Sequence, residues 1–107
     1  MKDLHKMFSE LKKDFPEVDL RYEMLGKEIH EKSGPLSDKV RWLIKIATSG
    51  ASNHLTALET HIAKAREAAV TEEEIKHTLL MLITTTGFPT FMESYSVYVA
   101  VQRKVDR

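Results

Sequence analysis

Apolar residues recur every three or four positions along most of this chain, and that spacing limits the fold more than any other feature. Near the N-terminus the spacing is kept by Leu4, Met7, Phe8 and Leu11. It lays one apolar stripe along a first helix, which should end before Pro16 because proline disfavours helical backbone at the preceding residue. A second helix is expected over residues 17–31, since Gly34 and Pro35 then interrupt the chain.

Capping residues predict where the later helices begin and end. Ser37 suits the N-cap of a helix that runs to Gly50. The residues of this helix expected to face the core are Val40, Leu43, Ile44 and Ala47. A further helix is expected over residues 53–69. Thr71 and Glu74 then form a capping box, which starts a helix that runs to residue 86 and is ended by Gly87.

The segment that begins near Pro89 is the one place where a strand competes with a helix. Its β-branched and aromatic residues favour a strand, yet Phe91, Tyr95, Tyr98 and Val101 also keep helical spacing. No other segment resembles a strand, so a strand here would leave its backbone groups unpaired. We therefore expect an all-α fold, a compact bundle of about six helices forming one domain over residues 1–107.

Charge and composition exclude several classes of partner. Sixteen basic residues balance sixteen acidic ones, so no overall field would attract nucleic acid. The longest apolar run covers residues 79–83, which is too short to cross a bilayer, and the N-terminal residues lack the apolar centre of a signal peptide. We therefore expect a cytoplasmic protein with no membrane partner. The sequence contains no cysteine, which excludes disulfides, thiolate metal sites and thiol redox chemistry carried by these residues.

Two histidines, His54 and His61, stand seven residues apart in the helix expected over residues 53–69. That spacing puts them on one face, two turns or about 10 Å apart. A metal ion usually takes histidines four residues apart on a helix, so no metal site is predicted. Two interpretations remain: a chemical site, or half-buried rings with one satisfied nitrogen at the edge of the core.

Three motifs in the second half of the chain bear on that choice. They are LSDKVRWLIKIA, THIAKAREAAVTEEEI and GFPTFMES, in this order within residues 36–93. Together they resemble the carboxymuconolactone decarboxylase family, which includes the alkylhydroperoxidase-like proteins. The resemblance implies an alkylhydroperoxidase-like all-α fold.

The resemblance also assigns positions to the site. In the peroxidase branch, two cysteines precede a histidine by seven and four residues, and a glutamate stands twelve residues before the first cysteine. Counted back from His61, those positions hold His54, Ala57 and Trp42. Because a thiol peroxidase needs the sulfur nucleophile, that activity is not expected here.

The decarboxylase branch lacks the cysteine pair and keeps the histidine, so its chemistry is the one that the resemblance implies for His61. The expected function is a lyase that needs no cofactor and acts on a small carboxylated lactone or related acid, with His61 as acid or base. His54, Trp42 and Glu93 are candidates for the pocket, Glu93 because some relatives carry a carboxylate at that position. A dicarboxylate lactone also needs a cation, for which the helices offer Arg41, Lys45, Lys64 and Arg66.

Two other functions stay open. One is a family member that is not catalytic and only binds a small ligand or assembles; the other is a redox accessory that uses thiols of a partner. A cavity beside His61 with polar walls would favour the lyase, whereas close packing by apolar side chains would favour a structural role.

Self-association is expected from the last helix. A domain of this size buries only about two-thirds of the surface of its unfolded chain. The apolar residues of the last helix cannot all face one small core: Phe88, Phe91, Met92, Tyr95, Val97, Tyr98, Val99 and Val101. An uncovered patch of this kind usually marks an association surface, and the family resemblance implies a homo-oligomer, a trimer or hexamer.

Overall fold

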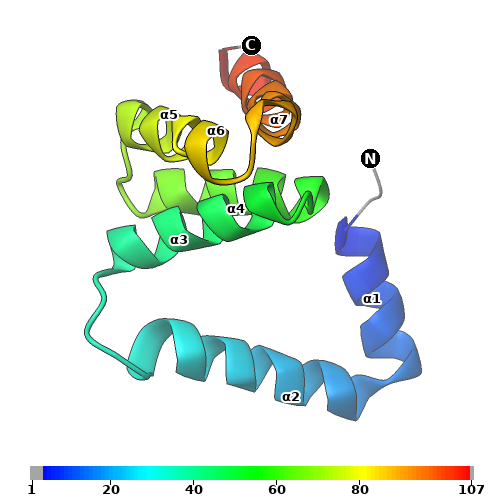
Figure 1. The fold of residues 1–107 in the computed structure, drawn as a ribbon. Helices are drawn as coiled ribbons and strands as arrows, with labels where there is room; N and C mark the ends of the chain where they lie inside the picture. The colour runs from blue at the N-terminus through cyan, green and yellow to red at the C-terminus, as the bar shows by residue number, and fades with distance from the viewer. Residues whose placement is uncertain (1–3, 107) are drawn as a thin grey trace.

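The computed structural model describes residues 4–106 and the side chains of residues 6–102. Every regular element in this part of the chain is helical (Figure 1). The elements in chain order are α1 (Leu4–Asp14), α2 (Pro16–Lys27), the π-helical turn η1 (Glu28–Lys32), α3 (Asp38–Ala51), α4 (Leu55–Glu67), α5 (Glu72–Leu80), α6 (Leu82–Thr85) and α7 (Phe88–Asp106). Since α5 and α6 are two parts of one expected helix, the expectation of an all-α bundle of about six helices is confirmed.

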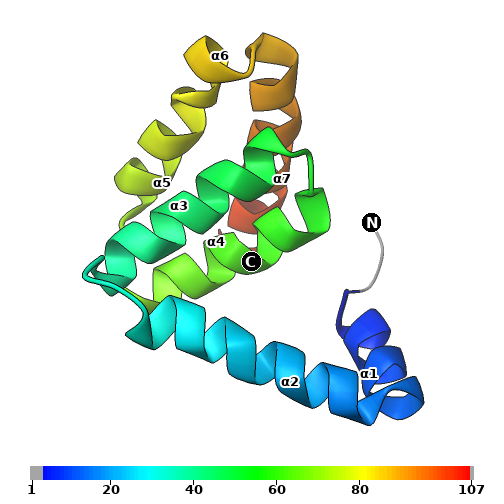
Figure 2. The same cartoon turned by 60° about the horizontal axis from the view of Figure 1, so that its bottom comes forward.

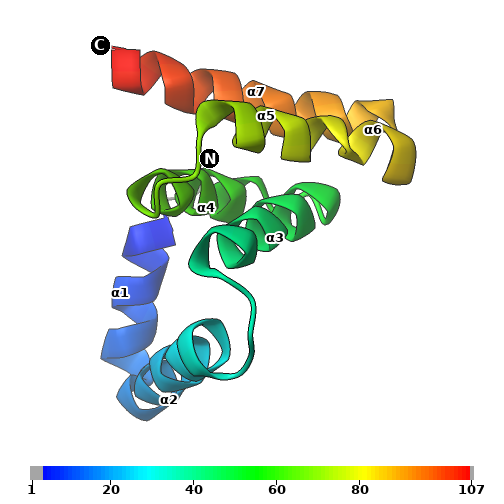
Figure 3. The ribbon, with the colours of Figure 1, turned by 90° about the vertical axis from the view of Figure 1, so that its left-hand side faces the viewer.

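The helices fall into two parts, which we name the arm (residues 4–32) and the body (residues 38–106). In the body, α3 and α4 lie side by side and α5, α6 and α7 cover one side of them (Figures 1 and 2). In the arm, α1 and α2 form an L (Figure 1). The last element of the arm, η1, leads into the loop before α3 (Figure 3). Helix α2 begins at Pro16, one residue before the expected start, because the ring of proline suits the first position of a helix.

The hydrophobic core lies within the body. Its buried apolar residues are Ile46, Leu58, Ile62, Ala65, Val70, Ile75, Leu79, Leu82, Phe91, Val97, Tyr98 and Val101. The prediction for α3 is wrong for Val40 and Ile44, which are exposed, whereas Leu43 is partly buried and packs against the core. The fully buried residues of this helix are Ile46, Ser49 and Gly50. The face with the smaller residues is buried since α3 crosses α7 closely there: a Cβ placed on Gly50 would lie 2.9 Å from Ser94 Oγ.

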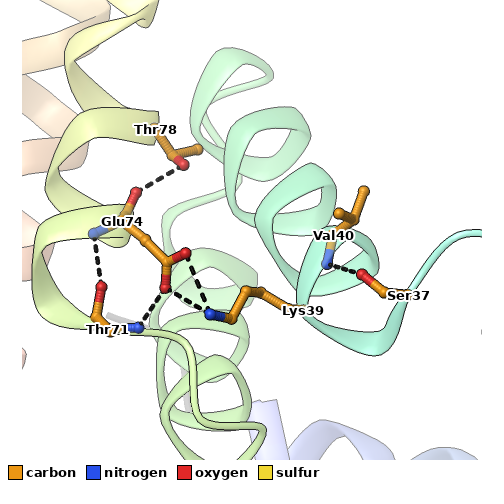
Figure 4. A network of polar contacts seen from close by, with 6 residues as sticks. All are labelled: Ser37, Lys39, Val40, Thr71, Glu74 and Thr78. Atoms are coloured by element: carbon orange, nitrogen blue, oxygen red, sulfur yellow. Dashed lines mark hydrogen bonds and ion pairs between the residues drawn. The ribbon is translucent and has the colours of Figure 1, made fainter.

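Two predicted caps are present, and a contact between Lys39 and Glu74 links the first turns of the helices that they start (Figure 4). Ser37 accepts a hydrogen bond from the Val40 N–H at 3.3 Å and starts α3. Thr71 and Glu74 form the expected capping box at the start of α5, with bonds of 2.8 and 3.1 Å. The Glu74 carboxylate also receives the Lys39 ammonium at 3.1 Å, which connects the first turn of α3 to that of α5.

Left-handed backbone sets both ends of α4. Asn53 and Ala69 have φ values of 59° and 64°. The expected helix over residues 53–69 is therefore shorter, and His54 is the N-cap residue that precedes α4. The next expected helix is also interrupted, because Met81 separates α5 from α6, and Gly87 ends it with a φ of 104°.

The last segment is the helix α7, so the choice of helix over strand is confirmed. Residues Phe91, Val97, Tyr98 and Val101 face the core, whereas Phe88, Met92 and Tyr95 stay 39–57% exposed. The exposed apolar side chains expected on α7 are thus present, but only on part of the helix.

A larger apolar surface, which was not expected from the sequence, lies on the arm. Nine apolar residues of the arm are 42–62% exposed: Met7, Phe8, Phe15, Val18, Leu20, Tyr22, Met24, Leu25 and Ile29. Five of the nine lie on α2 and point to different sides of it, so α1 and the body leave most of the apolar surface of α2 uncovered; they are Val18, Leu20, Tyr22, Met24 and Leu25.

No helix within residues 4–106 combines the length and the hydropathy needed to cross a membrane.

Candidate functional site

His61 lies in the middle of α4 and faces α3. Its Nδ1 is 3.2 Å from the Lys45 carbonyl oxygen and 3.2 Å from Ser49 Oγ. The Ser49 hydroxyl donates its own proton to the Lys45 carbonyl at 2.6 Å. Since a carbonyl only accepts, Nδ1 carries the proton of the neutral ring, and Nε2 keeps the lone pair.

The surroundings of His61 keep its ring neutral. Burial lowers the pKa of His61 below its ordinary value of 6.5, and the nearby Lys45 ammonium lowers it further, although the bond to the Lys45 carbonyl acts in the opposite direction. At neutral pH the ring therefore presents an unprotonated Nε2, which can accept a proton.

Lys45 supplies a positive charge beside this ring. Its Nζ lies 4.9 Å from the centroid of the Trp42 ring, in a cation–π contact, and the Trp42 and His61 rings are 6.1 Å apart. Burial lowers the pKa of the Lys45 ammonium, while Asp38 raises it. A bound anion would offset the lost hydration of this ammonium, so Lys45 is the best placed of the four cations considered above.

The other three cations have partners elsewhere. Arg66 forms a bidentate ion pair with Glu72 at 2.6 and 2.9 Å. Lys64 lies 3.6 Å from Glu67 on the surface of α4, and Arg41 donates to the Leu36 carbonyl at 2.7 Å, near η1.

Trp42 connects His61 to His30, a residue that the sequence did not single out. The rings of His30 and Trp42 are 4.5 Å apart, and His30 Nε2 donates to the Asp38 carboxylate at 2.9 Å. The side chain of His30 is only 11% exposed. No signal in the sequence announces this contact, because it forms only when η1 folds back on the start of α3.

The remaining candidates lie apart from this group. His54 is exposed, and its backbone N–H donates to the Ser49 carbonyl at 2.9 Å while its side chain provides no cap for α4. Glu93 is exposed on α7. The structure thus brings together Trp42 and His61 with Lys45 and His30, and leaves His54 and Glu93 at the surface.

Within the described part of the chain, no group of three or more histidine and carboxylate side chains is arranged to hold a metal ion. The sequence contains no cysteine, so no thiol stands beside His61. The side chains that the group offers are the imidazoles of His61 and His30, the ammonium of Lys45 and the indole ring of Trp42.

Comparisons with known proteins agree with this architecture. The chain is similar over 94% of its length, with a TM-score of 0.82, to the crystal structure of apo-lpg0406, a carboxymuconolactone decarboxylase family protein from Legionella pneumophila. The two share 24% sequence identity, and the match covers 89% of the Legionella chain, so this likeness shows the fold. A comparison with curated proteins found no match. The family model of the carboxymuconolactone decarboxylases matches residues 16–100, which is most of the chain. By this match, the protein belongs to the carboxymuconolactone decarboxylase family.

Proposed function

We propose that the protein is a lyase without a cofactor, which removes carbon dioxide from a small carboxylated lactone or a related acid. The observation that carries the proposal is the hydrogen bond from His61 Nδ1 to the Lys45 carbonyl at 3.2 Å. That bond fixes the tautomer, so that Nε2 can take up a proton and deliver it. Family membership supports the same class of reaction.

The proposed step needs little more than a proton donor and a cation. The bond between carbon and the leaving carboxylate breaks, and its electron pair moves into the conjugated lactone carbonyl. His61 Nε2, which has taken up a proton from solvent, then returns it to carbon. The product is the lactone with one carboxylate fewer, and the imidazole is again unprotonated. General acid–base catalysis of this kind contributes typically about 10²- to 10⁴-fold in rate.

Lys45 is proposed to bind the negative charge of the substrate. Its ammonium is near enough to His61 to lower the pKa of the ring, and it rests on Trp42 instead of on a carboxylate. An ammonium bound to a ring face keeps its donors available for an acid. The partner expected for the site is therefore a small acidic ligand.

The test is carbon dioxide release from carboxymuconolactone by the purified protein and four variants. His61→Asn keeps a donor toward the Lys45 carbonyl but removes Nε2, and should lower kcat by about 10²-fold or more. Lys45→Met should raise KM about tenfold with a smaller effect on kcat. His77→Asn and Lys64→Met are the matched controls, because they make the same two substitutions at exposed positions. Both should leave kcat and KM unchanged. Equal rates for His61→Asn and the unaltered protein would contradict the proposal, as would the absence of turnover.

We further propose that the protein forms a homo-oligomer, a trimer or a hexamer. Nine exposed apolar side chains of the arm and three of α7 support this, because patches of such size usually mark association surfaces. Light scattering at micromolar concentration should give a multiple of the 12.3 kDa chain mass. Met24→Glu, in the arm, should reduce that mass, and a mass near 12.3 kDa for the unaltered protein would refute the assembly.

This arm also favours a second candidate function, a family member that assembles or binds a ligand without catalysis. That candidate would be supported by an oligomer that binds small acids near His61 and releases no carbon dioxide from them.

A further inference from the structure

A cavity lies at the elbow where η1 leads into α3. Its volume is about 230 Å³. Apolar walls come from Ile29, Pro35 and Leu36, and polar groups come from His30 and Arg41. The volume is below the roughly 300–1,000 Å³ of pockets for drug-sized ligands, so it suits a smaller molecule.

Arg41 brings a positive charge to this cavity. Its side chain is 23% exposed, and Nε is held by the Leu36 carbonyl at 2.7 Å. Nη1 lies 3.8 Å from the Asp38 carboxylate, too far for a direct hydrogen bond. The guanidinium is thus positioned through Nε, while its terminal nitrogens can bind a carboxylate in the paired geometry that arginine favours.

In the second polar group, His30, only one of the two ring nitrogens has a hydrogen-bond partner among the described residues. Nε2 donates to Asp38 at 2.9 Å, whereas Nδ1 is buried and has no hydrogen-bond partner among the described residues. Buried polar atoms without partners are rare in folded proteins, and a bound ligand that supplies the missing hydrogen bond is one explanation for such an atom. The cavity also borders a π-helical turn, and turns of this kind are frequent at functional sites.

We propose that the elbow cavity binds a small organic carboxylate, with its charge on Arg41 and its apolar part against Ile29, Pro35 and Leu36. The cavity shares His30 with the group at His61, but neither His61 nor Lys45, on which the proposed lyase depends, lines it. The inference therefore stands or fails independently of the proposed lyase.

The proposal also predicts that the negative charge of Asp38 weakens carboxylate binding, whereas the positive charge of Arg41 strengthens it. The Asp38 carboxylate lies near the same guanidinium and competes with a bound carboxylate for it. Removing its charge should tighten the binding of an anion and leave a neutral ligand unaffected.

The test measures the binding of cyclohexanecarboxylate by calorimetry and by the fluorescence of Trp42, the single tryptophan of the chain, whose ring contacts His30. Cyclohexanecarboxamide serves as the uncharged counterpart. The carboxylate should bind at least tenfold more tightly than the amide, since hydrogen bonds between charged groups are the stronger ones. Arg41→Met should weaken carboxylate binding about tenfold or more, Asp38→Asn should strengthen it a few-fold, and His61→Asn should leave it unchanged.

Two further variants keep the test decisive if Arg41→Met fails to fold. Gly34 lines the cavity, and a Cβ built on it meets no atom within 4 Å, so Gly34→Leu should fold and obstruct the site. Gly26 in α2 is equally free of neighbours and is absent from the cavity wall, so Gly26→Leu is the matched control and should bind normally. The proposal is overturned if the unaltered protein shows no saturable binding, if the amide binds as well as the carboxylate, or if Gly34→Leu binds like Gly26→Leu.

Discussion

Replacing Gly50 with alanine should destabilise the protein, although alanine normally stabilises a helix. The new Cβ would stand 2.9 Å from Ser94 Oγ and 3.1 Å from Leu82 Cδ1, inside the crossing of α3 and α7. Overpacking of this kind costs about 1–3 kcal/mol. Higher helix propensity returns about 0.5–1 kcal/mol, so the net loss of unfolding free energy should be about 1–2 kcal/mol.

Ser94 makes this prediction sharper, because its side chain is completely buried and Oγ finds no hydrogen-bond partner in the described part of the chain. Ser94→Ala should therefore stabilise the protein by about 0.5–1 kcal/mol. In the double variant Gly50→Ala/Ser94→Ala, residue 94 has no Oγ. Its nearest atom to the Cβ of residue 50 is then the Cβ of residue 94, at 3.6 Å, which is an ordinary contact. The two changes should then be coupled by about 1 kcal/mol, with the double variant more stable than the sum of the single ones.

Urea unfolding followed by circular dichroism measures all four proteins of this cycle. Gly26→Ala is the matched control, since a Cβ there meets no neighbour and should raise stability by about 0.5–1 kcal/mol. If Gly50→Ala stabilises the protein as Gly26→Ala does, or if the coupling is zero, the close approach of α3 and α7 is not present in solution.

Three further predictions concern single side chains. Because burial lowers the pKa of His61, the unfolded chain takes up a proton before the folded one as pH falls, so the stability due to the neutral ring is present above pH 6.5 and lost below it. His61→Asn should therefore flatten the dependence of the unfolding free energy on pH between about pH 7.5 and 5. An unchanged slope would contradict this. Tyr98 donates a hydrogen bond to Glu72 at 2.9 Å, so Tyr98→Phe should lower the unfolding free energy, measured in urea, by about 1 kcal/mol. Burial raises the pKa of Tyr98 to about 12, so the same variant should also lose the ultraviolet absorbance change of a phenol that titrates near pH 12. Ala69 holds a φ of 64°, so Ala69→Gly should raise the unfolding free energy by about 0.5–1 kcal/mol, and a loss of stability would show that this turn is not left-handed in solution.

Local signals in the sequence predicted local structure well. The Thr71 and Glu74 capping box forms within four residues, so its chemistry is visible in the sequence and the structure confirms it. Periodicity was less informative for α3, because it shows which residues share a face but not which face another helix will cover. The contact of α3 with α7 at Gly50 buried the side with the small residues, and this left Val40 and Ile44 exposed.

The candidate site was predictable only in part, for the same reason. His61 and Trp42 are 19 positions apart, and the family resemblance, not any spacing rule, brought them into one hypothesis. Their neighbours Lys45 and His30 depend on how α3 packs against α4 and η1, which no pattern in the sequence encodes. His54 was misplaced because the left-handed turn at Asn53 starts α4 two residues later than expected.

The two left-handed turns beside α4 also restrict how the gene for this protein can change. Asn53 and Ala69 stop the helix at both ends, so an inserted or deleted codon between them cannot be absorbed by lengthening or shortening it. Each such event would rotate the residues beyond it by about 100°. An event that precedes His61 would turn its ring away from the Lys45 carbonyl, even though every side chain of the group remained in the sequence. Substitutions, in contrast, leave the register intact, so laboratory libraries that aim to alter this site should exchange residues of α4 and keep its length.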